Sequence, residues 1–416
     1  MSEPLPRRVA VTGIGVVAPN GNGTDAFWKS TEAGISVLDR VTREGCEHLP
    51  LRVAGEVRDF EADSAVEERY LVQTDRFTHF ALAAADRALD DAGLGRADTE
   101  AAPFSIGVVT AAGSGGGEFG QRELQQLWGK GSRFVGPYQS IAWFYAASTG
   151  QISIRRGFKG PCGVVASDEA GGLDALAHAA RAVRRGTDAV VAGSTEAPLA
   201  PYSMVCQLGY PELSTEADPA RAYRPFTTAA CGFVPAEGGA MLVVEDERSA
   251  RERGVEVRAW LAGHAATFTG AGRWEQSRDG LAHAIRGALA EADCAPEEID
   301  VVFADALGVL EADRAEALAI ADALGRHGRR VPVTAPKTGI GRGYGAAPVL
   351  DVAAAVLAMG HGVIPPTPNV FDICHDLDLV VGRARAAEPR TALVLSRGLM
   401  GSNSALVLRH GATQVR

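Results

Sequence analysis

Two glycine clusters are the first residues of the chain that could bind a ligand. Gly13-Ile14-Gly15-Val16-Val17-Ala18 follows a short apolar segment, as a dinucleotide fingerprint does. That fingerprint needs a helix to begin at once, so that its N-terminal amides meet the pyrophosphate. The turn-forming run Pro19 to Gly23 comes next instead, which argues against this site. Gly113 to Gly117 lacks the Lys and the Ser or Thr of a phosphate-binding loop, so nucleotide binding is not expected there either.

The cysteines are the next candidates, as nucleophiles, metal ligands or disulfide partners. Six are present, at positions 46, 162, 206, 231, 294 and 374, and none forms a Cys-x-x-Cys pair. This scatter is neither a disulfide framework nor a zinc site. We therefore expect buried, reduced thiols, including Cys162, in a cytoplasmic protein that needs no metal or cofactor.

Composition and charge exclude several classes of partner. The chain has 416 residues, of which 46% are hydrophobic and 22% charged, as in an ordinary globular protein. Its net charge of -10 argues against nucleic-acid binding and against anionic membrane surfaces, which both attract basic proteins. No segment is apolar for long enough to span a bilayer, and Met1 to Arg8 shows no secretion signal.

The elements that must position any site follow a duplicated order. In the first half, continuous apolar runs predict strands, and Ala-rich segments with apolar residues three and four apart predict helices. These are strand 8–12, helix 80–89, strand 106–110, helix 172–185, and strands 189–193 and 239–245. The second half repeats the order with strand 257–263, helix 281–289, strand 301–305, helix 346–359, and strands 391–396 and 404–409.

This repetition predicts the fold class. Continuous rather than alternating apolar strands are covered on both faces, and strands that alternate with helices indicate an α/β arrangement. Two such halves that share a helical layer would stack as five layers, α-β-α-β-α. We place the boundary between residues 253 and 254, with halves 1–253 and 254–416 that pack as one body.

Several spaced motifs resemble the β-ketoacyl-ACP synthases of the thiolase fold. In chain order they are Val11 to Val17, Asp75-Arg76-Phe77, Arg224-Pro225-Phe226, Gly232 to Gly238 and Pro365-Pro366-Thr367. The resemblance runs from Arg8 to about Arg409, and the duplicated α/β order is what that fold requires. An active member carries a nucleophilic Cys at a helix N-terminus, two His and a Lys.

At the matching positions this chain keeps only the Lys. The nucleophile turn reads Val165 to Gly172, with Glu169 in place of the Cys. Asp305 and Arg342 stand where the two His would be, and Lys337 is retained. The resemblance therefore implies that the chain does not itself catalyse condensation, because a carboxylate cannot hold a thioester and Arg342 cannot act as an acid or base near neutral pH.

The closest resemblance within the family is to the chain length factors, the β subunits of type II ketosynthases. Their turn motif Ser-Asp-Gln-Ala-Gly-Gly appears here as Ser167 to Gly172, with Glu169 in place of the Gln. The resemblance implies a heterodimer with a catalytic ketosynthase, which an acyl carrier protein supplies and in which a polyketide chain grows. Gly398 to Asn403 takes the place of the gating Gly-Phe-Gly-Gly loop of active members.

The resemblance also implies how such a subunit acts. In chain length factors, one helix lines a tunnel at the heterodimer interface, and its side chains limit product length. The matching positions are Gly117, Gly120 and Leu124, whose small volumes imply a roomy tunnel and a long product. Tyr202 and Met204 either close the far end of the tunnel or pack in the core.

Four charged residues in one pocket would be costly unless paired. We therefore predict ion pairs between Glu169 and Arg342 and between Asp305 and Lys337. Two other functions remain open at this point. Glu169 would support malonyl decarboxylation in an enzyme with residual activity, or the subunit would only stabilise its partner.

Overall fold

A computed structural model describes residues 8–95, 102–270 and 274–412. The first half of the chain holds strands β1 (Val9–Ala18), β5 (Ile106–Ala111), β6 (Cys162–Val165), β7 (Ala189–Glu196) and β8 (Gly238–Asp246). The second half holds β9 (Ala259–Phe268), β10 (Val301–Phe303), β11 (Pro332–Thr334), β15 (Thr391–Arg397) and β16 (Ser402–His410). Short strands of two residues complete the set: β2 (Gly21–Asn22), β3 (Asp39–Arg40), β4 (Val53–Ala54), β12 (Val363–Ile364), β13 (Asp378–Leu379) and β14 (Arg385–Ala386).

The two halves repeat one another strand by strand. The sheet order β6-β5-β7-β8-β1 in the first half matches β11-β10-β15-β16-β9 in the second. The directions match as well, since β5 is parallel to β6 and β7 while β8 is antiparallel to β7 and β1. The corresponding strands of the second half show the same pattern. Antiparallel pairing of Ala10 with Trp260 and of Val11 with Ala259 joins the halves into one sheet.

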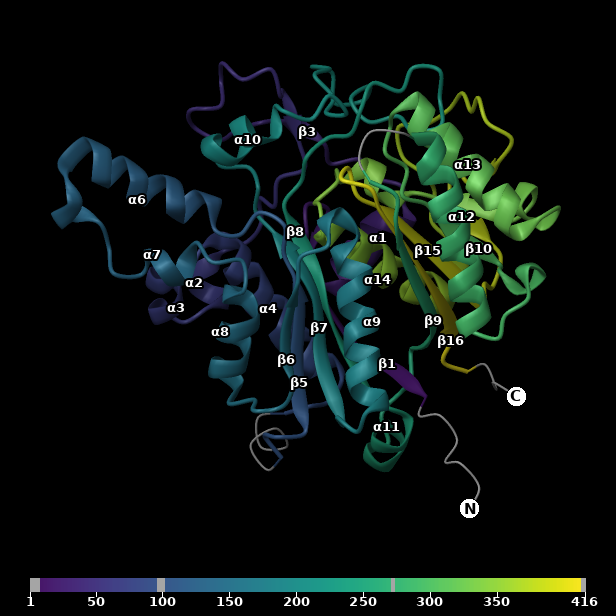
Figure 1. The fold of residues 1–416 in the computed structure, drawn as a ribbon, viewed down its shortest axis with the longest axis horizontal. Coiled ribbons are helices and arrows are strands. Elements are labelled where there is room, and N and C mark those ends of the chain that lie inside the picture. Colours follow the sequence, from purple (N-terminus) through teal and green to yellow (C-terminus); the bar gives the residue numbers. More distant parts are fainter. Residues whose placement is uncertain (1–7, 96–101, 271–273, 413–416) are drawn as a thin grey trace.

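The main helices form three layers around these strands (Figure 1). Helices α4 (Arg76–Asp91) and α8 (Ala147–Arg156) cover the outer face of the first half, and α12 (Trp274–Glu291) and α13 (Leu310–Leu324) cover that of the second. Helices α9 (Gly171–Arg184) and α14 (Ala346–His361) pack against each other and against strands of both halves. Separate apolar cores lie on the two outer faces and in the middle, so the five-layered α/β fold predicted from the sequence is confirmed.

Seven further α-helices occur in the described part of the chain. They are α1 (Thr24–Glu32), α2 (Ala62–Ala65), α3 (Glu68–Gln73), α6 (Gly117–Lys130), α7 (Gln139–Ala142), α10 (Pro201–Gln207) and α11 (Glu247–Arg253). Helices α6 and α7 project from the first half, well away from the second (Figure 1).

The first glycine cluster has a structural role that the sequence did not reveal. Gly13 and Gly15 lie inside β1 and not after it, because the strand continues to Ala18 before β2 folds back on it. A Cβ atom at Gly15 would collide with the carbonyl oxygen of Ala84 in α4. These glycines therefore let the helix pack directly on the strand, which accounts for their spacing without a nucleotide.

Candidate functional site

Glu169 lies in the turn between β6 and α9. The turn contains a short 3-10 helix, Asp168–Ala170, and Asp168 has a φ of 57°, which is uncommon outside glycine. The side chain of Glu169 is buried, and its carboxyl oxygen Oε2 accepts a hydrogen bond of 2.9 Å from the backbone N–H of Leu399. Its neighbour Asp168 accepts one of 2.7 Å from Met400. Two acidic side chains thus accept hydrogen bonds from the loop 398–403.

This loop and the turn fit each other closely. A Cβ atom at Gly398 would overlap the carboxylate of Asp168, so a larger residue there would displace this side chain. Burial, together with the hydrogen bond to Asp168, raises the pKa of Glu169 well above its usual range, and the more distant positive charge of Arg342 only partly opposes this. The carboxyl group of Glu169 therefore keeps its proton to a higher pH than an exposed glutamate would.

Asp305 is the centre of a buried ion-pair network. Arg342 donates to its carboxylate at 2.8 Å, and Arg397 donates at 3.2 Å through Nε and at 3.0 Å through its backbone N–H. Arg397 also forms an ion pair of 3.1 Å with Glu316 of α13. Burial by itself would raise the pKa of Asp305, but the surrounding cations hold it below the usual range.

Lys337 belongs to a neighbouring pair. Its ammonium group forms a salt bridge with the buried Asp351 of α14. It also donates to the backbone carbonyl oxygens of Ala304 at 2.8 Å and of Asp305 at 3.2 Å. The retained lysine is thus held by three acceptors within the protein.

The predicted ion pairs are therefore wrong in their partners. Within the described part of the chain, Glu169 has no salt bridge, and Arg342 pairs with Asp305 instead. Lys337 meets Asp305 only at its backbone oxygen and pairs with Asp351. Sequence reasoning missed Arg397, Glu316 and Asp351. Arg397 and Asp351 are charged residues within an otherwise apolar strand and helix, which is the signal of a buried partner, whereas the charged helix around Glu316 gives no such signal.

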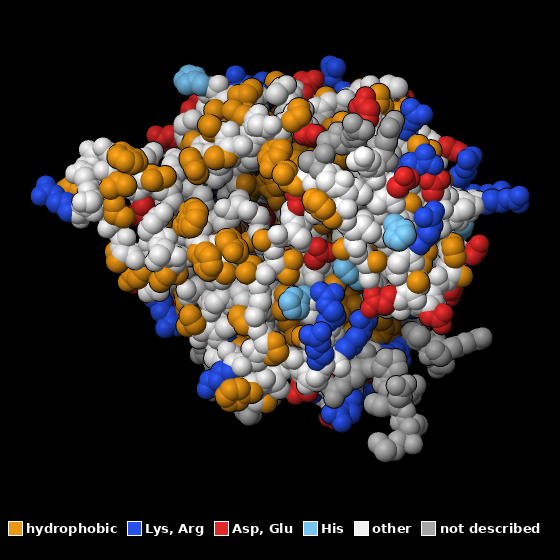
Figure 2. Space-filling view, in the orientation of Figure 1, with side chains coloured by type: hydrophobic (Ala, Val, Ile, Leu, Met, Phe, Trp, Pro, Cys, Tyr) orange, Lys and Arg blue, Asp and Glu red, His pale blue; other side chains and the backbone are white. Residues whose placement is uncertain are grey.

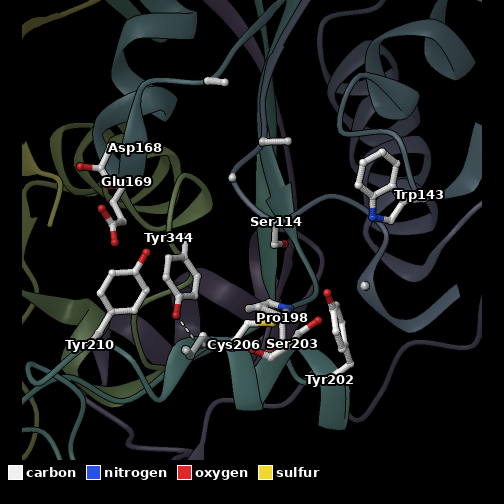
Figure 3. A pocket seen from close by; sticks show the side chains of 15 residues that line it. Ser114, Trp143, Asp168, Glu169, Pro198, Tyr202, Ser203, Cys206, Tyr210 and Tyr344 are labelled. Atoms are coloured by element: carbon white, nitrogen blue, oxygen red, sulfur yellow. Dashed lines mark hydrogen bonds between the residues drawn. The ribbon is translucent and has the colours of Figure 1, made fainter. Parts of the chain in front are cut away.

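A cavity of about 500 Å³ lies beside Glu169 (Figure 3). One end holds Asp168, Glu169, Tyr210 and Tyr344, and Trp143 lies toward the other. Between them the lining residues are small or polar: Ala112, Gly113, Ser114, Gly117, Ala166, Pro198, Tyr202, Ser203, Cys206 and Gln207. The volume is within the range of about 300–1,000 Å³ that is typical of small-molecule sites.

Of the predicted tunnel residues, only Gly117 and Tyr202 line this cavity. Gly120 lies one turn further along α6, where a Cβ atom would be 3.1 Å from Cδ1 of Trp143. Leu124 is partly exposed on the same helix. Met204 is fully buried and contacts Cys46 across 3.4 Å, which favours the core-packing interpretation for that residue.

Glu196, at the end of β7, shapes the wall of the cavity. Its buried carboxylate accepts hydrogen bonds from the backbone N–H of Gly113 at 2.5 Å and from the hydroxyl of Ser114 at 2.7 Å. Asp75 accepts a further bond of 2.7 Å from Phe119 in the first turn of α6. These hydrogen bonds hold the glycine cluster 113–117, which leads into α6, in place.

The expectation of buried thiols is largely wrong. Cys46 and Cys294 are buried, but Cys162, Cys206, Cys231 and Cys374 are exposed. Cys162 is exposed because β6 is the edge strand of the sheet. None of the six forms a disulfide. Within residues 8–95, 102–270 and 274–412, no cluster of metal-ligating side chains occurs, and no helix is long and apolar enough to cross a membrane. Of the segment Met1 to Arg8, only Arg8 is described.

Family models match most of the chain. The N-terminal domain of beta-ketoacyl synthase matches residues 6–250, and the C-terminal domain matches residues 258–371. The chain belongs to the β-ketoacyl synthase family. It is 77% identical over 406 residues, 98% of this chain and 96% of the relative, to a Streptomyces coelicolor protein named polyketide beta-ketoacyl synthase 2.

The relatives also distinguish between the branches of this ketosynthase family. The chain is 50% identical to the tetracenomycin polyketide synthase ketoacyl synthase beta subunit of Streptomyces glaucescens, over 99% of this chain and 100% of that protein. Identity falls to 34% with a polyketide beta-ketoacyl synthase 1 of Streptomyces halstedii, over 97% and 98% of the two chains. The predicted resemblance to chain length factors is thereby confirmed.

A solved structure agrees with this assignment. The ishigamide ketosynthase/chain length factor superposes with a TM-score of 0.88 at 28% identity, over 97% of this chain and 99% of that chain. This agreement over nearly the whole length confirms the predicted thiolase-type ketosynthase fold.

Proposed function

We propose that this protein is the chain-length-determining subunit of a heterodimeric type II polyketide β-ketoacyl-ACP synthase and does not itself catalyse condensation. The observation that carries the proposal is the turn at the N-terminus of α9. By the family resemblance a nucleophilic thiol would stand at Glu169, and here a buried carboxyl group accepts a hydrogen bond from Leu399. The growing acyl chain is then held by a cysteine of the partner ketosynthase.

The degenerate positions support this proposal chemically. Condensation needs a thiolate that carries the acyl group and donors that stabilise the enolate left by decarboxylation. Asp305 has its carboxylate engaged by Arg342 and Arg397, and Lys337 is engaged by Asp351. Asp305, Lys337 and Arg342 are thus held in ion pairs and are structural in this proposal, and Glu169 lacks the thiol that condensation requires.

An exposed surface supports assembly with a ketosynthase. Strand β6 ends the sheet, so its outer edge is available for pairing with another chain. Hydrophobic side chains gather beside it, over α6 to α8 (Figure 2). We call the following exposed residues the apolar patch: Leu124, Trp128, Phe134, Ile141, Trp143, Phe144, Tyr145 and Ile154. Apolar surface of this kind is typical of an obligate interface.

The relatives are consistent with such an assembly. One solved structure, described as a type II PKS acyl-carrier protein in complex with its ketosynthase bound to the hexaketide, superposes with a TM-score of 0.86 at 28% identity, over 97% of this chain and 99% of that chain. We infer that this protein joins a ketosynthase and meets its acyl carrier protein through that complex, in the cytoplasm. The growing polyketide then runs along α6, past Gly117, Gly120 and Leu124.

The decisive experiment enlarges one glycine of α6. The complex is assembled from this protein, a cysteine-containing ketosynthase and a carrier protein, and its products are measured by mass spectrometry. Gly120→Phe should shorten the product, because the new ring takes up volume next to Trp143 that the chain would otherwise use. Gly129→Phe is the control, since a Cβ atom there has no neighbour within 4 Å.

The outcomes separate the candidate functions. Unchanged product length in Gly120→Phe, with an intact heterodimer on size-exclusion chromatography, would contradict length control and favour a purely stabilising role. Decarboxylation of malonyl carrier protein by the isolated subunit, lost in Glu169→Ala, would instead show residual enzymatic activity.

A further inference from the structure

The cavity beside Glu169, with a volume of about 500 Å³, is large enough to hold a small organic ligand. Trp143 and Tyr202, which line it, are 55% and 51% exposed, and Trp143 belongs to the apolar patch that the proposed partner would cover. The cavity extends from there to the buried Glu169, and Tyr210 and Tyr344 line it at that end (Figure 3). It therefore reaches from the proposed heterodimer interface into the body of this subunit.

Gly117 keeps this passage open. It lies at the start of α6, and a Cβ atom there would collide with the hydroxyl of Ser203 on α10. Any side chain at this position would have to occupy the space between the two helices. The glycine therefore leaves a gap where the cavity would otherwise be divided.

The lining residues select the chemistry of a ligand. None of them is Lys, Arg or His, whereas two are acids, so a carboxylate or phosphate group would be repelled. The hydroxyl groups of Tyr202, Ser203 and Tyr210 make no hydrogen bond to any described residue, although that of Tyr344 donates to Gln207. Aromatic walls with free hydroxyl donors suit a neutral, extended chain that carries carbonyl oxygens.

We propose that the far end of the growing poly-β-ketone passes Gly117 and is bound in the Glu169 cavity of this subunit. The limit of chain length is then the cavity floor, formed by Glu169, Tyr210 and Tyr344, and not α6 alone. Free hydroxyl groups donate to the ketone oxygens, which carry no net charge for the two acids of the cavity to repel. This inference rests on the proposed function, because it requires the tunnel at the heterodimer interface.

The test places a bulky residue inside the cavity, beyond α6. Cys206 lines the cavity from α10 and is exposed, so Cys206→Trp fills the space without replacing a core residue. Its neighbour Val205 is also exposed but does not line the cavity, which makes Val205→Trp the matched control. In the complete complex, Cys206→Trp should shorten the main product by at least one ketide unit, and Val205→Trp should not.

The comparison with Gly120→Phe keeps the two proposals separate. If Gly120→Phe shortens the product and Cys206→Trp leaves it unchanged in an intact heterodimer, the cavity is not used and the proposed function stands. If neither variant changes the product, chain-length control by this subunit is itself refuted.

A second measurement reads occupancy directly, without relying on product length. N-ethylmaleimide is added to the complex during turnover of malonyl carrier protein, or with carrier protein that lacks malonyl. Alkylation of Cys206 should slow about tenfold when a chain is present, whereas the exposed Cys374, outside the cavity, should react equally in both states. Equal rates at Cys206 in the two states, whether fast or slow, would overturn the proposal.

Discussion

The buried charged residues near the degenerate positions form ion pairs that stabilise the fold. Lys337, Arg342 and Arg397 are buried, and their acidic partners Asp305, Glu316 and Asp351 are buried with them. The three cations and three acids balance in charge, and their hydrogen bonds to backbone groups satisfy much of the remaining polarity. Such a network is costly to disturb, because removal of one member leaves a buried charge without a partner.

Removal of Asp305 should therefore destabilise the protein strongly. In Asp305→Ala, both Arg342 and Arg397 lose a carboxylate, and we expect the free energy of unfolding to fall by about 3–5 kcal/mol. The matched control, Asp322→Ala, breaks a partly exposed pair with Arg278 and should cost at most about 1 kcal/mol. Chemical denaturation monitored by circular dichroism measures both.

The same variant has a defined pH dependence. Because the pKa of Asp305 is lowered by folding, its stabilising contribution is present above the pKa of the unfolded chain, about 4. It is lost as the pH falls through the lower pKa of the folded protein. When the pH is lowered below about 4, the free energy of unfolding should therefore fall less in Asp305→Ala than in the wild type. An equal fall in the two proteins would contradict the assigned ion pair.

Helices pack on strands through glycine at equivalent places in the two halves. Gly13 of β1 faces the backbone of Ala88 and Ala92 in α4, and Gly263 of β9 faces that of Ala288 and Ala292 in α12. In both cases a Cβ atom would collide with the helix backbone, which cannot move aside as a flexible side chain can. The Ala-rich helices and these glycines together bring helix and sheet into close contact.

Substitution at one of these contacts should separate its helix from the sheet. Gly263→Ala adds a methyl group against the backbone of α12, and we expect a loss of stability of about 1–3 kcal/mol. Gly129→Ala adds the same group inside α6 where no atom lies within 4 Å, and it should be neutral or stabilise by up to about 1 kcal/mol. Thermal unfolding of the two variants tests this, and equal shifts would refute the close-packing explanation.

The whole molecule exposes one side of its first half for association. The edge strand β6 and the apolar patch lie next to each other, and the cavity opens toward the same side through Trp143. The surface that would bind the partner therefore also contains the entrance through which the polyketide would reach the cavity. A free subunit would leave this apolar surface in water, which favours an obligate heterodimer.

A charge placed within the apolar patch should weaken the heterodimer. Phe144→Glu buries a carboxylate at the proposed interface, and we expect the dissociation constant for the ketosynthase to rise at least about tenfold. Phe371→Glu is the control, because Phe371 is also exposed but belongs to the second half. Analytical ultracentrifugation measures both, and an unchanged constant for Phe144→Glu would place the interface elsewhere.

Local patterns in the sequence were enough to predict the duplicated fold, the family and the degenerate positions. Apolar periodicity is local, so it located the strands and helices, although β1 and β9 extend beyond the predicted segments. The motifs at Glu169, Asp305, Lys337 and Arg342 are also local, because each is recognised by its neighbours in the chain.

The partners of these charged residues could not be predicted without the three-dimensional arrangement of the chain. Asp305, Arg342 and Arg397 come from three separate segments, so their pairing depends on how β10, β15 and the loop before α14 stack. Opposite charge alone predicted the wrong partners, because sequence contains no distances. The exposure of Cys162 on an edge strand and the cavity between α6 and α10 were undetermined for the same reason.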